Sequence, residues 1–143
     1  MHNMKFRQSV YIILKKGDEF LVTKGNNANL YFWNFPGGGI ENGESALDAF
    51  YREAYEELGL AKDDFLEVKD TSLVNKYTWP DHIKKDKDFQ GQEKRLMLGL
   101  VKSNINIDTS ITNEISEYKW VKKGDLKSIL KFDDLADLAL KVI

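Results

Sequence analysis

Residues 38–60 read GGIENGESALDAFYREAYEELGL, and this stretch carries the strongest structural signal in the chain. Its middle predicts one amphipathic helix. Ser45 followed by Asp48 is typical of a capping box, and Gly59 can end the helix in the left-handed conformation. Apolar residues that recur at helical spacing predict a stripe facing the core, namely Leu47, Phe50, Tyr51, Ala54 and Leu58.

A second stripe of the same helix carries three glutamates, Glu53, Glu56 and Glu57. Like charges three or four residues apart destabilise a helix by roughly 0.2–0.5 kcal/mol per pair. Only Arg52 is placed to compensate, by pairing with Glu56. Three converging carboxylates suit Mg²⁺ or Mn²⁺, because hard cations prefer oxygen ligands and offset the repulsion. An acidic helix face exposed to water is the alternative, and the helix by itself does not separate the two interpretations.

The loop before the helix, PGGG at residues 36–39, favours a functional site, because glycines let the backbone approach a ligand closely. Seven residues match the pattern G-x5-E-x7-R-E-U-x-E-E-x-G-U, where U is bulky and apolar: Gly38, Glu44, Arg52, Glu53, Glu56, Glu57 and Gly59. Seven fixed residues match by chance on the order of once in a million chains of this length. The sequence therefore resembles the Nudix hydrolases, with the small Ala54 at the first U position as the one departure.

Strands and helices are expected to mix along the chain, which indicates an α/β or α+β fold. Strands are expected at residues 6–14, 20–23, 65–77, 96–101 and 118–121, and helices after residue 125. The resemblance implies an α-β-α sandwich around a central mixed sheet, with residues 38–60 as a loop-helix-loop catalytic motif. The length of 143 residues and the absence of a linker or repeat predict a single domain over residues 1–143.

Composition excludes several classes of protein. A net charge of −2 gives no general attraction to nucleic acid or anionic membranes, so contacts with long nucleic acid are not expected. The absence of cysteine excludes disulfides, thiolate metal sites and a cysteine nucleophile, and fits the reducing cytosol. The apolar run at residues 10–14 is too short for a signal peptide or a membrane span. We expect a cytoplasmic protein, and the sequence leaves a homodimer open.

The resemblance implies metal-dependent hydrolysis of a phosphoanhydride bond, with Mg²⁺ as cofactor and Mn²⁺ as a substitute. The metal-binding positions that carry over are Glu53, Glu56, Glu57 and Gly38. Arg52 is expected to orient a glutamate ligand through a charge-assisted hydrogen bond. Glu44 is expected to brace the loop or to bind a further metal through water. Structural roles are expected for the glycines of the motif, Gly37, Gly38, Gly39 and Gly59.

The general base is predicted outside the motif. Some Nudix relatives use a glutamate before a late strand that contains tryptophan, in the pattern Glu-x5-Trp. Glu114 and Trp120 fit this spacing, and Glu117 is the second candidate. The alternative for either acid is an exposed loop residue. Neither His2 nor His82 belongs to a readable catalytic arrangement.

Two further segments resemble the branch that contains dinucleoside polyphosphate hydrolases and RNA 5′-pyrophosphohydrolases. They are WNFPGG at residues 33–38 and the pair formed by YTWP at 77–80 and GQ at 91–92. Tyr77 stands 17 residues beyond Leu60, where this branch tends to place a tyrosine, which favours diadenosine tetraphosphate, cleaved to ATP and AMP. The branch usually has aromatic residues after the GQ segment, whereas Leu96 and Met97 stand here. Nucleoside triphosphates, ADP-ribose, RNA 5′-triphosphate ends and a nucleotide sensor without activity remain alternatives.

Substrate contacts are predicted at positions outside the motif. Arg7, Lys94 and Arg95 are candidates for binding phosphates, and Tyr77 for binding the nucleotide. Packing in the core is favoured for most aromatic residues at 31–35, with Trp33 as the candidate to contact a base. The alternating lysines and aspartates at residues 81–88 are interpreted as a solvated loop rather than a phosphate site.

Overall fold

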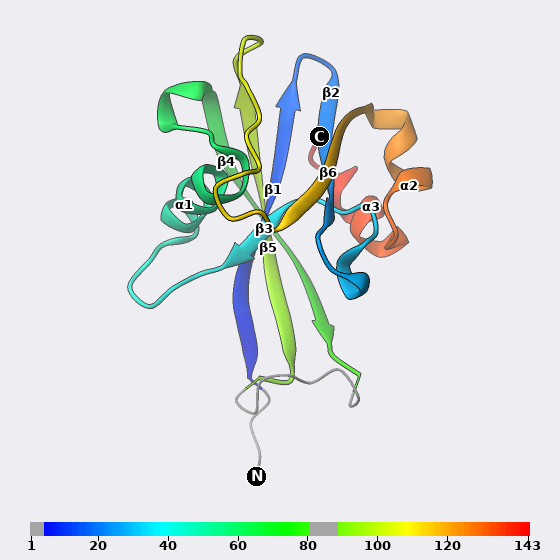
Figure 1. Cartoon of the computed structure of the whole chain (residues 1–143). Helices are drawn as coiled ribbons and strands as arrows, with labels where there is room; N and C mark the ends of the chain where they lie inside the picture. Colours follow the sequence, from blue (N-terminus) through cyan, green and yellow to red (C-terminus); the bar gives the residue numbers. More distant parts are fainter. Residues whose placement is uncertain (1–4, 81–88) are drawn as a thin grey trace.

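The computed structural model describes residues 5–80 and 89–143 (Figure 1). Within them, strands make up a single sheet and comprise β1 (Phe6–Lys16), β2 (Glu19–Gly25), β3 (Gly37–Gly39), β4 (Phe65–Thr78), β5 (Gly91–Val101) and β6 (Ile115–Lys122). The helices are α1 (Ala46–Leu58), α2 (Leu126–Ile129) and α3 (Asp133–Ala139), with 3₁₀ turns η1 (Ala28–Leu30), η2 (Lys62–Asp64) and η4 (Lys123–Asp125). No helix in the described ranges is long and apolar enough to span a membrane.

The sheet is mixed, as expected, and β1 lies at its centre. Its strand order is β4-β5-β1-β2-β6, with β3 attached to β1. β1 runs parallel to β5 over ten residue pairs, whereas every other strand pairing is antiparallel. β1 pairs with β2 only at its end, at Lys15 and Lys16, and pairs with β3 at residues 9–11. The short β3 therefore brings the glycine-rich loop directly against the central strand.

Two layers of helix cover the two faces of the sheet (Figure 1). Alternate side chains of β1 belong to different core clusters, as strand periodicity requires. Val10 and Ile12 pack in the cluster that contains α1, and Tyr11 and Ile13 pack in the cluster that contains α2 and α3. This arrangement confirms the α-β-α sandwich.

Local differences from the sequence-based expectations have clear causes. Leu47 was expected in the apolar stripe of α1, but it lies in the first turn and is 44% exposed, while Ala49 is fully buried instead. β5 begins at Gly91, five residues before the predicted start at residue 96. Its polar first half has no apolar run to reveal it, and only pairing with β1 and β4 makes it a strand.

Candidate active site

The ends of helix α1 fix the positions of its acidic residues. The Ser45 hydroxyl accepts a hydrogen bond from the Asp48 amide at 3.1 Å, and the Asp48 carboxylate accepts one from the Ser45 amide at 3.4 Å. Gly59 ends the helix at φ 69°, in the left-handed region that glycine tolerates best. Both predicted caps are confirmed. Between them, Glu53 and Glu57 are only 7% and 6% exposed, so they are not part of a solvated acidic face.

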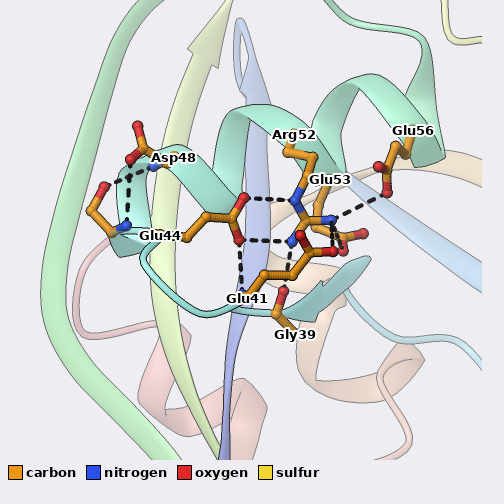
Figure 2. A network of polar contacts seen from close by, with 8 residues as sticks. Gly39, Glu41, Glu44, Asp48, Arg52, Glu53 and Glu56 are labelled. Atoms are coloured by element: carbon orange, nitrogen blue, oxygen red, sulfur yellow. Dashed lines mark hydrogen bonds and ion pairs between the residues drawn. The ribbon is translucent and has the colours of Figure 1, made fainter.

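Arg52 is the centre of a polar network that ties the helix to the glycine-rich loop (Figure 2). Its guanidinium donates to both carboxylate oxygens of Glu44, at 2.7 and 2.9 Å, and to the Gly39 carbonyl at 2.8 Å. It also donates to Glu53 at 2.9 Å and to Glu56 at 3.2 Å. The predicted Glu56 contact is present, but Glu44 is the bidentate partner. Arg52 therefore holds the loop and the helix in one geometry.

The same network sets the protonation of Glu44. Hydrogen bonds from Arg52, followed by one from the Glu41 backbone amide at 2.9 Å, lower the pKa of Glu44 to about 2. A carboxylate that accepts three hydrogen bonds stays ionised at any physiological pH. Glu44 therefore braces the loop, which is one of the two roles expected for it.

Gly38 leaves room for the Glu53 carboxylate. A Cβ atom at Gly38 would stand 2.2 Å from Cδ of Glu53, and one at Gly37 would stand 2.1 Å from the Val10 carbonyl oxygen. Neither position accepts a side chain without displacing its neighbour. Burial raises the pKa of Glu53, and the hydrogen bond from Arg52 opposes that rise. Gly38 thus lets the buried carboxylate pack directly on β3, and Gly37 lets β3 approach β1.

Glu57 forms a carboxyl pair with Glu114, the acid that precedes β6. Burial, then a hydrogen bond with Glu114 and the charge of Glu114, raise the pKa of Glu57 to about 8. The Thr112 hydroxyl also donates to Glu57, at 3.4 Å. Glu117 lies elsewhere, where it accepts a 2.6 Å hydrogen bond from the Tyr31 hydroxyl. The structure thus brings the first predicted base candidate to the motif and not the second.

The donor set fits a hard divalent cation, although its carboxylates do not converge in this structure. Among the residues that the structure describes, no three aspartates, glutamates or histidines form a ready-made metal cluster. Arg52 holds Glu53 and Glu56, whereas Glu57 turns to Glu114. The buried Glu57 carboxyl, held against a second acid, is favoured in its neutral form unless a cation is bound beside it. Oxygen-only donors around such a pair are what Mg²⁺ or Mn²⁺ binds.

Basic and phenolic side chains meet on the face of the sheet opposite α1. Arg7, Gln92 and Tyr77 occupy one row across β1, β5 and β4. Lys94 is half-buried, and its Nζ atom lies 4.4 Å from the centre of the Tyr11 ring. Burial, followed by the positive charge of Arg7, lowers the pKa of Lys94 to about 8, and the charge of Glu53 opposes this. Lys94 therefore lies within electrostatic reach of both Arg7 and the motif.

Arg7 also packs against the catalytic loop. Its Nη2 atom lies 2.5 Å from the position that a Cβ of Gly39 would take. Gly39 thereby lets the guanidinium cover the backbone of β3, on the opposite side from Glu53. Burial raises the pKa of the Tyr77 phenol, and the charge of Arg7 opposes that rise.

Two predicted substrate residues lie apart from this group. Arg95 points to the α1 face, because neighbouring residues of a strand alternate, and donates to Asp70 at 2.8 Å. It lines a cavity of about 220 Å³ on that face. Trp33 packs on the core with lysine ammonium groups near its ring, Lys119 at 4.4 Å and Lys24 at 4.9 Å from the ring centre. The charged segment 81–88, including His82, lies outside the described residues, as does His2.

A larger cavity of about 740 Å³ opens beside Arg7. Its lining combines aromatic, amide and basic side chains, from Arg7, Asn27, Ala28, Asn29, Leu30, Tyr31, Phe32, Trp79, Gln92 and Lys131. This volume is within the range of nucleotide and drug-sized ligand sites. Sequence reasoning did not single out Lys131, because it lies about fifty residues beyond Trp79, in a segment interpreted as packing helices. Its position is visible only once the chain is folded.

Comparison with known proteins agrees with this geometry. The NUDIX domain family model matches residues 5–140. Curated RNA pyrophosphohydrolases of Francisella philomiragia subsp. philomiragia and Francisella tularensis subsp. mediasiatica are each 33% identical over 121 residues, which cover 81% of this chain and 77% of the relative.

Solved structures show the same fold at low sequence identity. A C. elegans Ap4A hydrolase binary complex is similar with a TM-score of 0.69 at 18% identity, covering 93% of both chains. An E. coli dihydroneopterin triphosphate pyrophosphohydrolase is similar with a TM-score of 0.79 at 16% identity, covering 96% of this chain and 97% of the other. The chain belongs to the Nudix family and is a Nudix pyrophosphohydrolase.

Proposed function

We propose that this chain hydrolyses a phosphoanhydride bond in the polyphosphate of a nucleotide, and that diadenosine tetraphosphate, cleaved to ATP and AMP, is its substrate. The observation that carries the proposal is a pair of neighbouring basic side chains, one within electrostatic reach of the motif and the other lining a nucleotide-sized cavity. Lys94 lies within electrostatic reach of Glu53 and of Arg7, and Arg7 lines the 740 Å³ cavity. A polyphosphate bound to Lys94 and Arg7 would place one of its ends at the carboxylates of the motif and its nucleoside in the cavity.

The basic side chains would hold and orient the phosphates. Arg7 offers a planar fork of donors, and the half-buried Lys94 offers a point charge whose proton a bound phosphate would retain. Orientation of this kind contributes several kcal/mol to phosphoryl transfer, because it fixes the attacking and leaving oxygens in line. The aromatic rings of Phe32 and Trp79 give the cavity faces on which a base can stack.

The acidic residues would carry out the chemistry. We propose Glu53, Glu56, Glu57 and the adjacent Gly38 as the metal-binding positions, with Arg52 orienting Glu53. Mg²⁺, or Mn²⁺ in its place, supplies Lewis acidity and lowers the pKa of water. Glu114 would act as general base, because its carboxyl group already lies in hydrogen-bond contact with Glu57. Tyr77 and Trp33 stay predicted substrate contacts, while the Arg95–Asp70 ion pair removes the reason to retain Arg95.

A second substrate, the 5′-triphosphate end of RNA, has its own support. The 33% identical relatives are named RNA pyrophosphohydrolases. The same cations and the same cavity would serve a terminal nucleotide of RNA. The net charge of −2 limits this candidate to contacts near the 5′ end.

A turnover panel tests the proposal. Diadenosine tetraphosphate, 5′-triphosphorylated short RNA, nucleoside triphosphates and ADP-ribose would each be incubated with Mg²⁺, or with EDTA as control, and the products separated by chromatography. Formation of ATP and AMP in the Mg²⁺ arm alone supports the first substrate, and loss of pyrophosphate or phosphate from RNA supports the second. Nucleotide binding without any hydrolysis would contradict the catalytic proposal and favour a sensor.

We propose a single catalytic domain over residues 1–143 that works in the cytoplasm, with no membrane partner. The sequence and the fold leave the homodimer open. Sedimentation velocity across a concentration series would distinguish monomer from dimer, because only an associating chain changes its sedimentation coefficient with concentration.

A further inference from the structure

A second cavity adjoins the one beside Arg7. It has a volume of about 460 Å³ and is lined by Gly25, Asn26, Asn27, Ala28, Tyr31 and Ser116. Three of these residues, Asn27, Ala28 and Tyr31, also line the larger cavity. The turn η1 and Tyr31 therefore form a wall between two neighbouring cavities, and Tyr31 is the aromatic side chain common to both linings.

Tyr31 is unusually well held for an exposed residue. Tyr31 is 57% exposed, yet its hydroxyl donates a 2.6 Å hydrogen bond to the Glu117 carboxylate. The ammonium of Lys24 lies 4.5 Å from the centre of the ring and 3.9 Å from the Glu117 carboxylate. Contacts at the hydroxyl and at the ring thus fix the aromatic plane while much of it stays open to solvent.

Lys24 is itself held in place. Its ammonium lies 4.9 Å from the centre of the Trp33 ring, and Trp33 packs on the buried core. Cation–π contacts of this kind favour a fixed orientation of both partners. Tyr31 is therefore supported from the core through Trp33 and Lys24. An immobilised, exposed ring at the border of two cavities has the properties of a stacking platform, because little side-chain entropy remains to be lost on binding.

We propose that the second cavity receives a second nucleobase, stacked on Tyr31, of a substrate whose first base occupies the cavity beside Arg7. This inference rests on the proposed function and adds that the enzyme selects substrates with two bases. A dinucleoside polyphosphate or the first two nucleotides of an RNA 5′ end would supply the second base, whereas a nucleoside triphosphate would not. Tyr31 is then a specificity-determining residue.

The test compares substrates with one and two bases. For the wild-type chain and for Tyr31→Ala, kcat/KM would be measured with ATP, diadenosine tetraphosphate and a triphosphorylated RNA dinucleotide. We expect the preference for two-base over one-base substrates to fall by about 5- to 100-fold in Tyr31→Ala, as loss of one base–aromatic stack predicts. Tyr31→Phe keeps the ring and should retain most of the preference. Tyr118→Ala is the matched control, because Tyr118 is also exposed, at 44%, but follows Glu117 on β6 and faces the other way.

The outcomes separate this inference from the proposed function. An equal loss with one-base and two-base substrates, or no loss at all, would overturn the second-base site while leaving the hydrolase intact. If the wild-type chain cleaves none of the substrates, calorimetric binding of ATP, diadenosine tetraphosphate and a 5′-phosphorylated RNA dinucleotide in EDTA makes the same comparison. Unchanged relative affinities in Tyr31→Ala would then refute the site. A loss confined to the dinucleoside compound or to the RNA identifies the source of the second base.

Discussion

Replacing Glu57 by glutamine should stabilise the metal-free protein while removing its activity. Glu57 is 6% exposed, and its carboxyl group contacts that of Glu114. Burial and this contact raise the pKa of Glu57 from its usual 4.5 to about 8. The folded state therefore binds the Glu57 proton more tightly than the unfolded state does, and ionising Glu57 near neutral pH opposes folding. A glutamine side chain is neutral and can donate to Glu114 as the protonated acid does.

The size of the effect follows from the two pKa values. Each pKa unit corresponds to about 1.36 kcal/mol, so a rise from 4.5 to about 8 lowers the free energy of unfolding by about 4 kcal/mol at pH 8 and by less than about 1 kcal/mol at pH 5. Below pH 4.5 the acid is protonated in both states and the penalty disappears. The penalty thus develops between pH 4.5 and pH 8. Glu57→Gln removes it, which corresponds to a rise in melting temperature of roughly 10 °C at pH 8.

Urea unfolding in EDTA at pH 5 and pH 8 would measure this difference. Glu56→Gln is the matched control, because the Glu56 side chain is 40% exposed and its change should alter stability little at either pH. Equal or lower stability of Glu57→Gln at pH 8 would refute the raised pKa of the buried Glu57 carboxyl. In the presence of Mg²⁺, turnover of Glu57→Gln should fall by orders of magnitude, and Mg²⁺ should stabilise the wild-type chain more than the variant, since only ionised acids bind the cation well. Near-normal turnover would count against metal binding at this position.

Two other substitutions follow from the packing of the site. Gly38→Ala should lower turnover by about two orders of magnitude while circular dichroism shows the fold retained, because its Cβ would stand 2.2 Å from Cδ of Glu53 and displace that carboxylate. Gly124→Ala is the control, because a Cβ there meets nothing within 4 Å and should change neither turnover nor fold. Normal activity of Gly38→Ala would show that catalysis does not need Glu53 in its observed position. Lys94→Ala should raise KM in steady-state assays by about tenfold or more, because a charge-assisted contact with phosphate is lost. Arg95→Ala should leave KM unchanged, since Arg95 pairs with Asp70 on the other face of the sheet. Equal effects of the two substitutions on KM would contradict a phosphate-binding role for Lys94.

Local sequence signals predicted the helix of the motif accurately. Ser45 and Asp48 cap the first turn of the helix, and Gly59 ends the last turn. Each cap acts through residues three to five positions away, so the local sequence is enough to predict it. The central mixed sheet and its helical layers were implied by the family resemblance and are confirmed. The first half of β5 was missed, because a polar strand is defined by its neighbours and not by its own periodicity.

Contacts between distant residues were beyond the reach of the sequence. The pattern Glu-x5-Trp ranked Glu114 above Glu117, yet only the fold shows that Glu114 meets Glu57 while Glu117 meets Tyr31. Arg52 could be paired with Glu56 by helical spacing, but its strongest partner, Glu44, lies before the helix. The approach of a loop to a helix depends on how β3 docks on β1, and no local rule encodes it.

The sequence by itself determined the family and the reaction class and supplied the candidate acids of the motif, because these depend on residue types at fixed spacing within one motif. The tertiary structure decided on which face of the sheet each cation lies: adjacent residues Lys94 and Arg95 looked equivalent in the sequence, and strand alternation sent them to opposite faces. It also decided the protonation of Glu57 and the cavities on either side of Tyr31, since burial and pairing of charges arise only when separate segments come together.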